Sequence, residues 1–452
     1  MEILDMKRAA ELIEKRSFAE LKAALGEMMP ADTAELFGEL SEKGDSFSEK
    51  ELTLMFRILP KDTAAEVFTF MDNDMQVTLI NAFSDRELKA VLDELYLDDT
   101  VDIIEDMPAN VVQRILKNAD PEKRKQINEL LKYPEDSAGS IMTTEYVYFR
   151  RDDTVFEAME RIRAVGIVKE TVYTCYVTDR KRLIGSVSLL DLVVADDDEL
   201  IENVMDSNVL SVPVHEDRES VANLFSKHDL AAVPVVDNEE RIVGIITFDD
   251  IMDVMREENA EDIARMSAIS PYEEGYFKTG VFRHAGNRIV WLLVLMLSAT
   301  ITGFITGQFE AQIAAVPLLV AFLPMLTGTG GNCGSQSSSM VIQGMAVDEI
   351  RPKDFFAVIL KELGIAGICS TALAAVNFIR IMIFYHDPVI AGIVSVTLIG
   401  TMVLANLLGC VLPMAAKKLK ADPAIMSAPL LSTIVDSFST LLYFSIAMAV
   451  LK

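Results

Sequence analysis

Two stretches in the last third of the chain carry residues that could conduct a metal ion. Between Pro324 and Met345, glycine, serine and amide residues interrupt an apolar segment. A later apolar segment carries one acid near its middle, Asp436. Because unpaired polar groups are costly in hydrocarbon, these segments are expected to face other helices or water. A carboxylate at such depth costs about 2.5–3.5 kcal/mol to insert and indicates a functional site.

The chemistry of these stretches suits a hydrated divalent cation. Mg²⁺ sheds water reluctantly and is usually held by one or two carboxylates through a retained water shell. A path for it therefore needs few charges and many neutral oxygens. We predict that one acid supplies the charge and that neighbouring residues supply the oxygens. The predicted path residues are Asp436, Gly328, Thr329, Gly331, Asn332, Gln336 and Thr433.

The helices that position these residues should cross a membrane, whose core of ~30 Å needs about 20 mostly apolar residues. Five segments of residues 283–452 qualify: Ile289–Ile305, Ile313–Met345, Phe355–Phe384, Val389–Ala416 and Ala424–Leu451. Basic residues cluster before the first, after the second and after the fourth, which predicts a multi-pass protein of the cell membrane with an external C-terminus. Five helices are few to enclose a path, so we expect a homodimer in the lipid with the path on its axis.

The part of the chain before the membrane segments is strongly acidic. The 452 residues include 69 acids and 41 bases, of which eight acids and eleven bases follow Gly275. The first 275 residues therefore hold 61 acids and 30 bases, a formal charge of −31. This field argues against nucleic acid as a partner and suits a protein that handles cations. The N-terminus lacks the apolar core of a signal peptide, so we expect this part in the cytoplasm.

Residues 1–135 are predicted to be an all-α domain of superhelical helix pairs. Met29–Phe37 is similar to Leu59–Phe68, and Pro108 and Pro121 are placed to begin helices. A further helix is expected to start at Leu97, with Asp98 and Asp102 one turn apart on one face.

Residues 136–256 contain two copies of an α/β pattern, each with a helix between short strands. Gly185 and Gly244 are equivalent and lie 59 residues apart. The pattern resembles a tandem CBS pair, with copies at 136–200 and 201–256. The resemblance implies that Thr247 and Asp250 bind an adenosine nucleotide such as ATP; a pair that only dimerises is the alternative. Residues 257–282 are predicted to be an acidic connecting helix and a linker into the membrane.

Together these parts resemble the MgtE family of magnesium channels along nearly the whole chain. The motifs that carry the resemblance are Pro324–Asn332, continued by Gly334, Ser335 and Gln336, and Asp422-Pro423-Ala424, followed by Pro429, Thr433 and Asp436. The resemblance implies a homodimeric Mg²⁺ uptake channel, not an enzyme, with Asp436 as the pore acid and the connecting helix as a plug. Cys333 and Ser335 depart from the family pattern, which has a Thr and an Asn there.

The resemblance also implies that cytosolic Mg²⁺ closes the channel by bridging acidic faces and drawing the domains together. Bridging would favour the closed state if the ion binds the compact arrangement of the domains more tightly than the open one. The predicted Mg²⁺-sensing residues are Glu66, Asp98, Asp102, Asp229, Asp250, Asp253, Glu258, Glu261 and Asp262.

Other functions fit some of the same residues. A coupled carrier for divalent cations such as Co²⁺ or Mn²⁺ would use Asp436 to exchange a proton or Na⁺. A CBS-regulated channel of other selectivity would need basic groups in an anion path. An enzyme is disfavoured because the sequence has no HExxH or GxSxG motif. Mg²⁺, Co²⁺, Mn²⁺ and Ca²⁺ all accept oxygen ligands.

Overall fold

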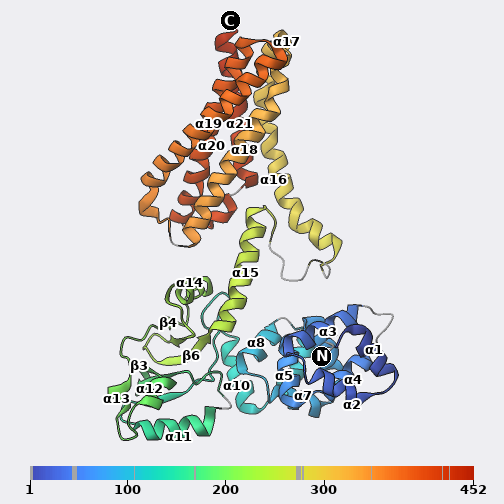
Figure 1. The fold of residues 1–452 in the computed structure, drawn as a ribbon, viewed down its shortest axis with the longest axis vertical. Helices are drawn as coiled ribbons and strands as arrows, with labels where there is room; N and C mark the ends of the chain where they lie inside the picture. Colours follow the sequence, from blue (N-terminus) through green and yellow to red (C-terminus); the bar gives the residue numbers. More distant parts are fainter. Residues whose placement is uncertain are drawn as a thin grey trace. The chain divides into compact units, whose positions relative to one another are not determined.

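The computed structural model describes residues 4–42, 48–105, 107–166, 169–270, 276, 279–347, 349–419, 421–426 and 428–451. The chain forms two compact units, a first unit of Met1–Met255 and a second unit of Arg256–Lys452 (Figure 1).

Helices make up the N-terminal half of the first unit, as predicted. Their bounds are α1 (Met6–Glu14), α2 (Phe18–Leu25), α3 (Pro30–Glu42), α4 (Glu49–Ile58), α5 (Lys61–Thr69), α6 (Asn73–Ala82), α7 (Asp85–Leu92), α8 (Leu97–Glu105), α9 (Ala109–Asn118) and α10 (Pro121–Leu130). The prediction that Pro108 and Pro121 open helices is confirmed, since α10 begins at Pro121 and Pro108 directly precedes α9. Proline has no amide hydrogen to lose in the first turn. The predicted helix start at Leu97 is confirmed by α8.

The weak repeat noticed in the sequence has a packing role. Phe37 of α3 and Phe68 of α5 occupy equivalent positions in the two copies, and both are fully buried. Their rings contact Phe56 of α4 edge to face, with centroids 6.5 and 6.1 Å away. The repeated aromatic residues therefore meet in one core.

The second half of the first unit contains two three-stranded sheets. Their strands are β1 (Tyr148–Arg150), β2 (Thr174–Asp179), β3 (Arg182–Ser188), β4 (Val212–Pro213), β5 (Ala232–Val236) and β6 (Ile242–Thr247). In each sheet the first strand runs parallel to the second and the third runs antiparallel to it. The accompanying helices are α11 (Val155–Val165), α12 (Leu189–Val194), α13 (Ile201–Val204) and α14 (Arg218–His228).

The two modules exchange their opening segments. The backbone of Thr143 pairs with Ile245 of the second sheet, and that of Asp206 pairs with Ser186 of the first, through N–H···O bonds of 2.8–2.9 Å. A Cβ on Gly244 would lie 2.8 Å from the Thr143 carbonyl oxygen, and one on Gly185 the same distance from that of Asp206. The equivalent glycines are therefore required where each module receives the other's backbone.

Helix α15 (Phe248–Met266) leads from the first unit into the second, which is helical. The other elements of the second unit are α16 (Val281–Gly307), α17 (Glu310–Ala315), α18 (Leu318–Ala346), η2 (Pro352–Asp354), α19 (Phe355–Tyr385), α20 (Pro388–Lys418), η3 (Pro423–Met426) and α21 (Ala428–Val450). The predicted segment Ile313–Met345 differs from the structure, because a break around Pro317 divides it into α17 and α18.

Among the described residues, four helical stretches are long and apolar enough to cross a membrane: Val281–Gly307, Pro352–Tyr385, Pro388–Lys418 and Pro423–Val450. They correspond to four of the five predicted spans. With 29 residues, α18 has the length for a fifth, but its polar residues lower its hydropathy, so its span stays a prediction.

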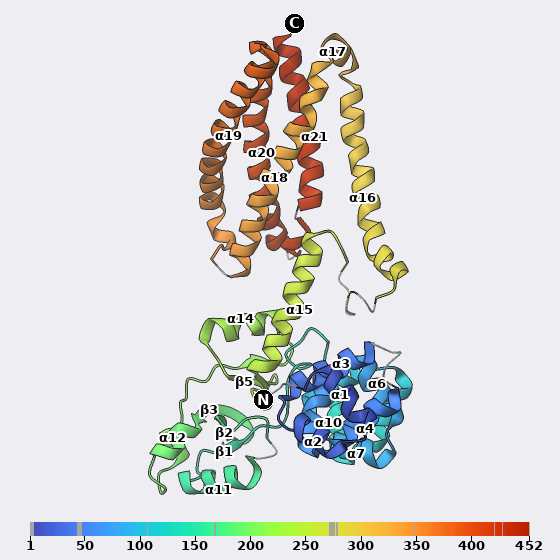
Figure 2. The ribbon, with the colours of Figure 1, turned by 45° about the vertical axis from the view of Figure 1, so that its right-hand side comes forward.

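Helix α18 runs beside α20 and α21 within the second unit (Figure 2). Glycines make this close approach possible. A Cβ on Gly330 would lie 2.5 Å from Thr401 Cγ2 of α20 and 2.8 Å from Val435 Cγ1 of α21. Helix α16 meets α21 through a hydrogen bond between the hydroxyls of Thr302 and Ser437, 2.8 Å apart.

Candidate functional site

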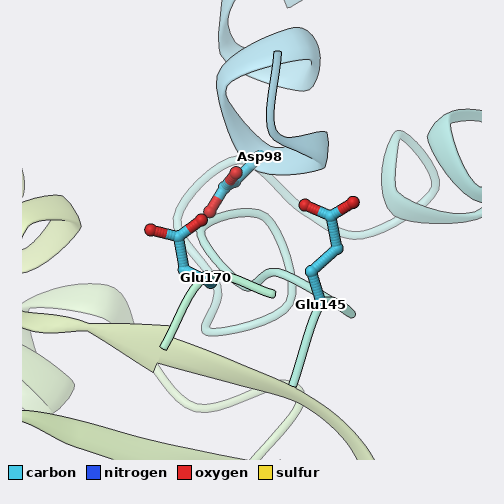
Figure 3. A group of neighbouring side chains, drawn as sticks. All are labelled: Asp98, Glu145 and Glu170. Atoms are coloured by element: carbon cyan, nitrogen blue, oxygen red, sulfur yellow. The ribbon is translucent and has the colours of Figure 1, made fainter. Parts of the chain in front are cut away.

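Three carboxyl groups converge in the first unit. Asp98 lies in the first turn of α8, while Glu145 and Glu170 lie in loops before β1 and β2. One carboxylate oxygen from each lies within 4.8 Å of the other two (Figure 3). The Glu170 amide donates to the Glu145 carbonyl oxygen at 2.9 Å. The Leu97 amide donates to Glu145 Oε2 at 3.2 Å, which ties these loops to the start of α8.

Burial makes ionisation of this cluster unfavourable. Asp98 is only 5% exposed, and burial followed by the charge of Asp99 raises its pKa to about 7. Burial followed by the charge of Asp98 raises the pKa of Glu170 to about 9. Glu170 Oε2 is buried and has no hydrogen-bond partner among the described residues. A cation held between these groups would restore the charged forms.

Further acids surround the three. Burial comes first among the causes that raise the pKa of Asp99 to about 6 and that of Asp250 to about 7, and neighbouring carboxylates add to both shifts. The pKa of Asp102 is raised to about 8 by burial and then by Asp250. The Asp102 residue is exposed, so water partly screens its charge.

Lys123 brings one positive charge to this region. Its Nζ donates to the Leu92 carbonyl oxygen at 2.7 Å and to that of Leu95. Burial lowers the pKa of Lys123, and the charge of Glu145 opposes that shift. The charge of Lys169 also acts on Glu145, and these two lysines cannot neutralise all the surrounding carboxylates. Their oxygens are the donors that Mg²⁺ and Ca²⁺ prefer, so the cluster is suited to a hard divalent cation.

The structure brings together only some of the predicted Mg²⁺-sensing residues. Asp98, Asp102 and Asp250 belong to the same acidic region, because the charges of Asp250 and Asp98 add to the burial that raises the pKa of Asp102, and Asp98 likewise adds to that of Asp250. Glu66 is exposed on α5. Its charge helps to raise the pKa of Tyr96, but burial and the charges of three other acids contribute more to that shift. The exposed Asp229 caps α14 with a φ of 50°.

The remaining predicted acids lie on α15. Asp253 is exposed, whereas Glu258, Glu261 and Asp262 are half-buried. Glu261 pairs with Arg265, which also pairs with Asp422 before η3. Burial followed by the charge of Asp422 raises the pKa of Asp262. The end of α15 is therefore tied by charge to the segment that precedes α21.

Glu145 and Glu170 were not predicted, because neither lies in a periodic segment or a recognised motif. The sequence carried only one usable signal for the wider cluster, the acidic pair Asp98-Asp99 at a helix start.

The predicted nucleotide-binding pair has a structural role. Thr247 Oγ1 donates to Asp250 Oδ2 at 2.6 Å, and the Thr247 amide donates to the same oxygen at 3.3 Å. The first module repeats this arrangement with Ser188 and Asp191, whose side-chain oxygens are also 2.6 Å apart. Both pairs stabilise the start of the following helix.

The predicted path residues lie on two helices in contact. Gly328, Asn332 and Gln336 recur every four residues and form an exposed face of α18. On α21, Thr433 and Asp436 are half-buried. The other two predicted path residues also lie on α18, where Thr329 is half-buried and Gly331 is buried. A Cβ on Gly331 would lie 3.1 Å from Ser432 Oγ, so α18 and α21 touch at this level.

Family models match three regions of the chain. "Divalent cation transporter" matches residues 323–446, "MgtE intracellular N domain" matches residues 44–136, and "CBS domain" matches residues 138–198 and 201–257.

Relatives cover nearly the whole chain. It is 34% identical to "Magnesium transporter MgtE" of Thermus thermophilus, over 98% of this chain and 97% of the relative. It is 29% identical to the protein of that name from Bacillus subtilis, over 97% and 95%.

Two solved structures are similar to the first part of the chain. The cytosolic domain of the Mg²⁺ channel MgtE in complex with ATP has a TM-score of 0.50 at 34% identity, and covers 54% of this chain and 97% of that one. The soluble part of a magnesium transporter has a TM-score of 0.50 at 29% identity, and covers 57% and 100%. These matches confirm the resemblance predicted from the motifs. The chain belongs to the MgtE family of divalent cation transporters.

Proposed function

We propose that this protein transports Mg²⁺ across the cell membrane and that cytosolic Mg²⁺ closes its path. As a member of a transporter family the chain is a multi-pass membrane protein and not an enzyme. The proposal for Mg²⁺ rests on relatives named magnesium transporters over nearly the full length of the chain.

The observation that supports the path is the contact between α18 and α21. It puts the helix with the polar face of Gly328, Asn332 and Gln336 against the helix with Asp436. In a single protomer that face is exposed. Exposure of polar side chains to lipid is energetically costly. A second copy packed against this face would line the path from both sides, so we propose a homodimer with the path on its axis.

The orientation follows from the basic residues that flank the membrane segments. These favour cytoplasmic N-terminal domains and an external C-terminus. The cluster of Asp98, Glu145 and Glu170 would then meet cytosolic Mg²⁺. Binding there would offset the repulsion between carboxylates and favour the compact arrangement in which α15 blocks the path.

A nucleotide is proposed as a second ligand of the first unit. The similar cytosolic domain was solved in complex with ATP. In this chain Thr247 and Asp250 match the nucleotide motif of CBS pairs, although their side chains already cap α15.

The path is tested by Mg²⁺ influx into proteoliposomes at several internal Mg²⁺ concentrations. Asp436→Ala is expected to slow influx about 100-fold, because the path loses the carboxylate that attracts the cation; this factor corresponds to about 2.7 kcal/mol in the barrier. Glu310→Gln, which changes an exposed acid outside the path, should leave influx unchanged. Normal influx through correctly inserted Asp436→Ala would overturn the proposed path. Unitary currents would favour a channel over a coupled carrier.

A further inference from the structure

The second unit contains a buried acid that the proposed path does not use. Glu362 lies on α19, in one of the candidate membrane spans, and is 7% exposed. A buried carboxylate is costly in such a segment and adds nothing to packing that an apolar side chain of similar size would not supply. Its presence therefore calls for a specific partner.

Asn406 of α20 is that partner. It is 3% exposed, and its Nδ2 donates to Glu362 Oε2 at 3.3 Å. Glu362 Oε2 accepts this bond, and an amide has one donating and one accepting end. Glu362 therefore fixes the orientation of the Asn406 amide, with its NH₂ group towards α19 and its oxygen turned away.

The oxygen of that amide meets the glycine-rich helix. Cys333 Sγ of α18 donates to Asn406 Oδ1 at 2.8 Å, and Ser337 Oγ donates to the Asn406 backbone oxygen at 3.2 Å. One turn further along α20, a Cβ on Gly409 would lie 2.5 Å from the Gly334 carbonyl oxygen. The three helices α18, α19 and α20 are therefore joined by one chain of polar contacts at a place where α18 and α20 approach closely.

We propose that Glu362 is a positioning residue for ion selection. Acting through Asn406, it fixes α18 at Cys333 and so sets the position of the neighbouring path residue Asn332. This inference rests on the proposed function. Mg²⁺ demands near-ideal geometry, while the larger Ca²⁺ accepts flexible and irregular coordination. Loosening α18 should therefore slow Mg²⁺ more than Ca²⁺.

The contact chain is tested without measuring transport. In the full-length chain with Cys175→Ser, Cys369→Ala and Cys410→Ala, Cys333 is the remaining thiol, and its alkylation by a maleimide in detergent is timed. Glu362→Leu should speed alkylation about tenfold, since it frees the Asn406 amide. Glu362→Gln should stay within about twofold, because its carbonyl oxygen can still accept from Asn406 Nδ2.

Ion selection is tested in proteoliposomes by the ratio of Ca²⁺ influx to Mg²⁺ influx. Glu362→Leu should raise this ratio about tenfold, Glu362→Gln should restore it, and Glu310→Gln should not change it. If Glu362→Leu does not fold, Glu362→Asp, which is one methylene too short for the contact, serves in both assays.

The outcomes separate the two proposals. Unchanged alkylation in Glu362→Leu overturns the contact chain, and faster alkylation with an unchanged ratio overturns its role in selection. Normal influx through Asp436→Ala overturns the proposed path and with it the role of Glu362 in selection, but it leaves the contact chain standing, because the alkylation result does not depend on transport.

Discussion

The two units treat buried negative charge in opposite ways. In the first unit Asp98, Glu145 and Glu170 crowd within 4.8 Å of one another. In the second, Glu362 faces the neutral amide of Asn406. Two like charges 4 Å apart repel by about 4 kcal/mol at an effective dielectric constant of 20. A carboxylate that accepts a hydrogen bond from an amide meets no such repulsion. The first arrangement changes when a cation arrives, and the second keeps its geometry whether or not an ion is present.

Neutralising the crowded carboxylates should have the largest effect. At a Mg²⁺ concentration one hundred times its dissociation constant, binding stabilises the compact state by about 2.7 kcal/mol. Wild-type protein should then be digested by protease about 100-fold more slowly than without Mg²⁺. The variant Asp98→Asn, Glu145→Gln, Glu170→Gln should lose this dependence on Mg²⁺, as measured by the digestion rate of the first unit.

A matched control neutralises three exposed acids of the same unit, Glu20→Gln, Glu27→Gln and Asp198→Asn. This control should keep the protection by Mg²⁺. A triple cluster variant that Mg²⁺ still protects as well as wild type would remove the cluster as the sensor.

Two glycines of α18 sharpen the view that the second unit depends on fixed packing. Gly330→Ala would force a methyl group to 2.5 Å from Thr401 Cγ2 and should cost about 1–3 kcal/mol. Gly328→Ala meets nothing within 4 Å and should stabilise the helix by about 0.5–1 kcal/mol. Thermal unfolding in detergent measures both. Equal midpoints for the two variants would contradict the close contact at Gly330.

The stability of the first unit should depend on pH. Its raised pKa values, about 6 for Asp99, 7 for Asp98 and Asp250, and 9 for Glu170, mean that the folded state binds more protons than the unfolded chain. Their contribution to stability is therefore complete below the ordinary carboxyl range near pH 4 and is lost as pH rises from there to about 9, most steeply below about pH 6. Each extra proton gives a slope of about 1.4 kcal/mol per pH unit.

Urea unfolding of the first unit at several pH values, with a chelator and then with saturating Mg²⁺, measures this slope. Mg²⁺ should flatten the dependence above pH 7, because the metal replaces the protons on the carboxylates. Stability that rises with pH in the presence of chelator would contradict the crowded arrangement.

Much of the fold was predictable because it depends on local patterns. Prolines and acidic residues marked the starts of α8, α9 and α10, and the 59-residue spacing of Gly185 and Gly244 identified two equivalent modules. These signals act within a helix or a strand, so they can be read in a single sequence.

The site was only partly predictable because it depends on distant segments. Asp98 was identified from a helix start, but Glu145 and Glu170 come from loops whose position is set by the packing of α8 on the first module. In the sequence, Glu362 lies near the start of an apolar segment, where an acid is usually exposed at the end of a helix. Only its contact with α20, 44 residues away, shows that it is buried and paired.

The exchange between the two modules limits how this protein can be divided. Thr143 closes the sheet edge at Ile245, and Asp206 closes the edge at Ser186. A fragment ending near residue 200 would leave an unpaired backbone edge, and such edges recruit other strands and aggregate. In protein engineering the modules should therefore be cloned, grafted or swapped together, since either one taken alone lacks a strand partner that only its neighbour provides.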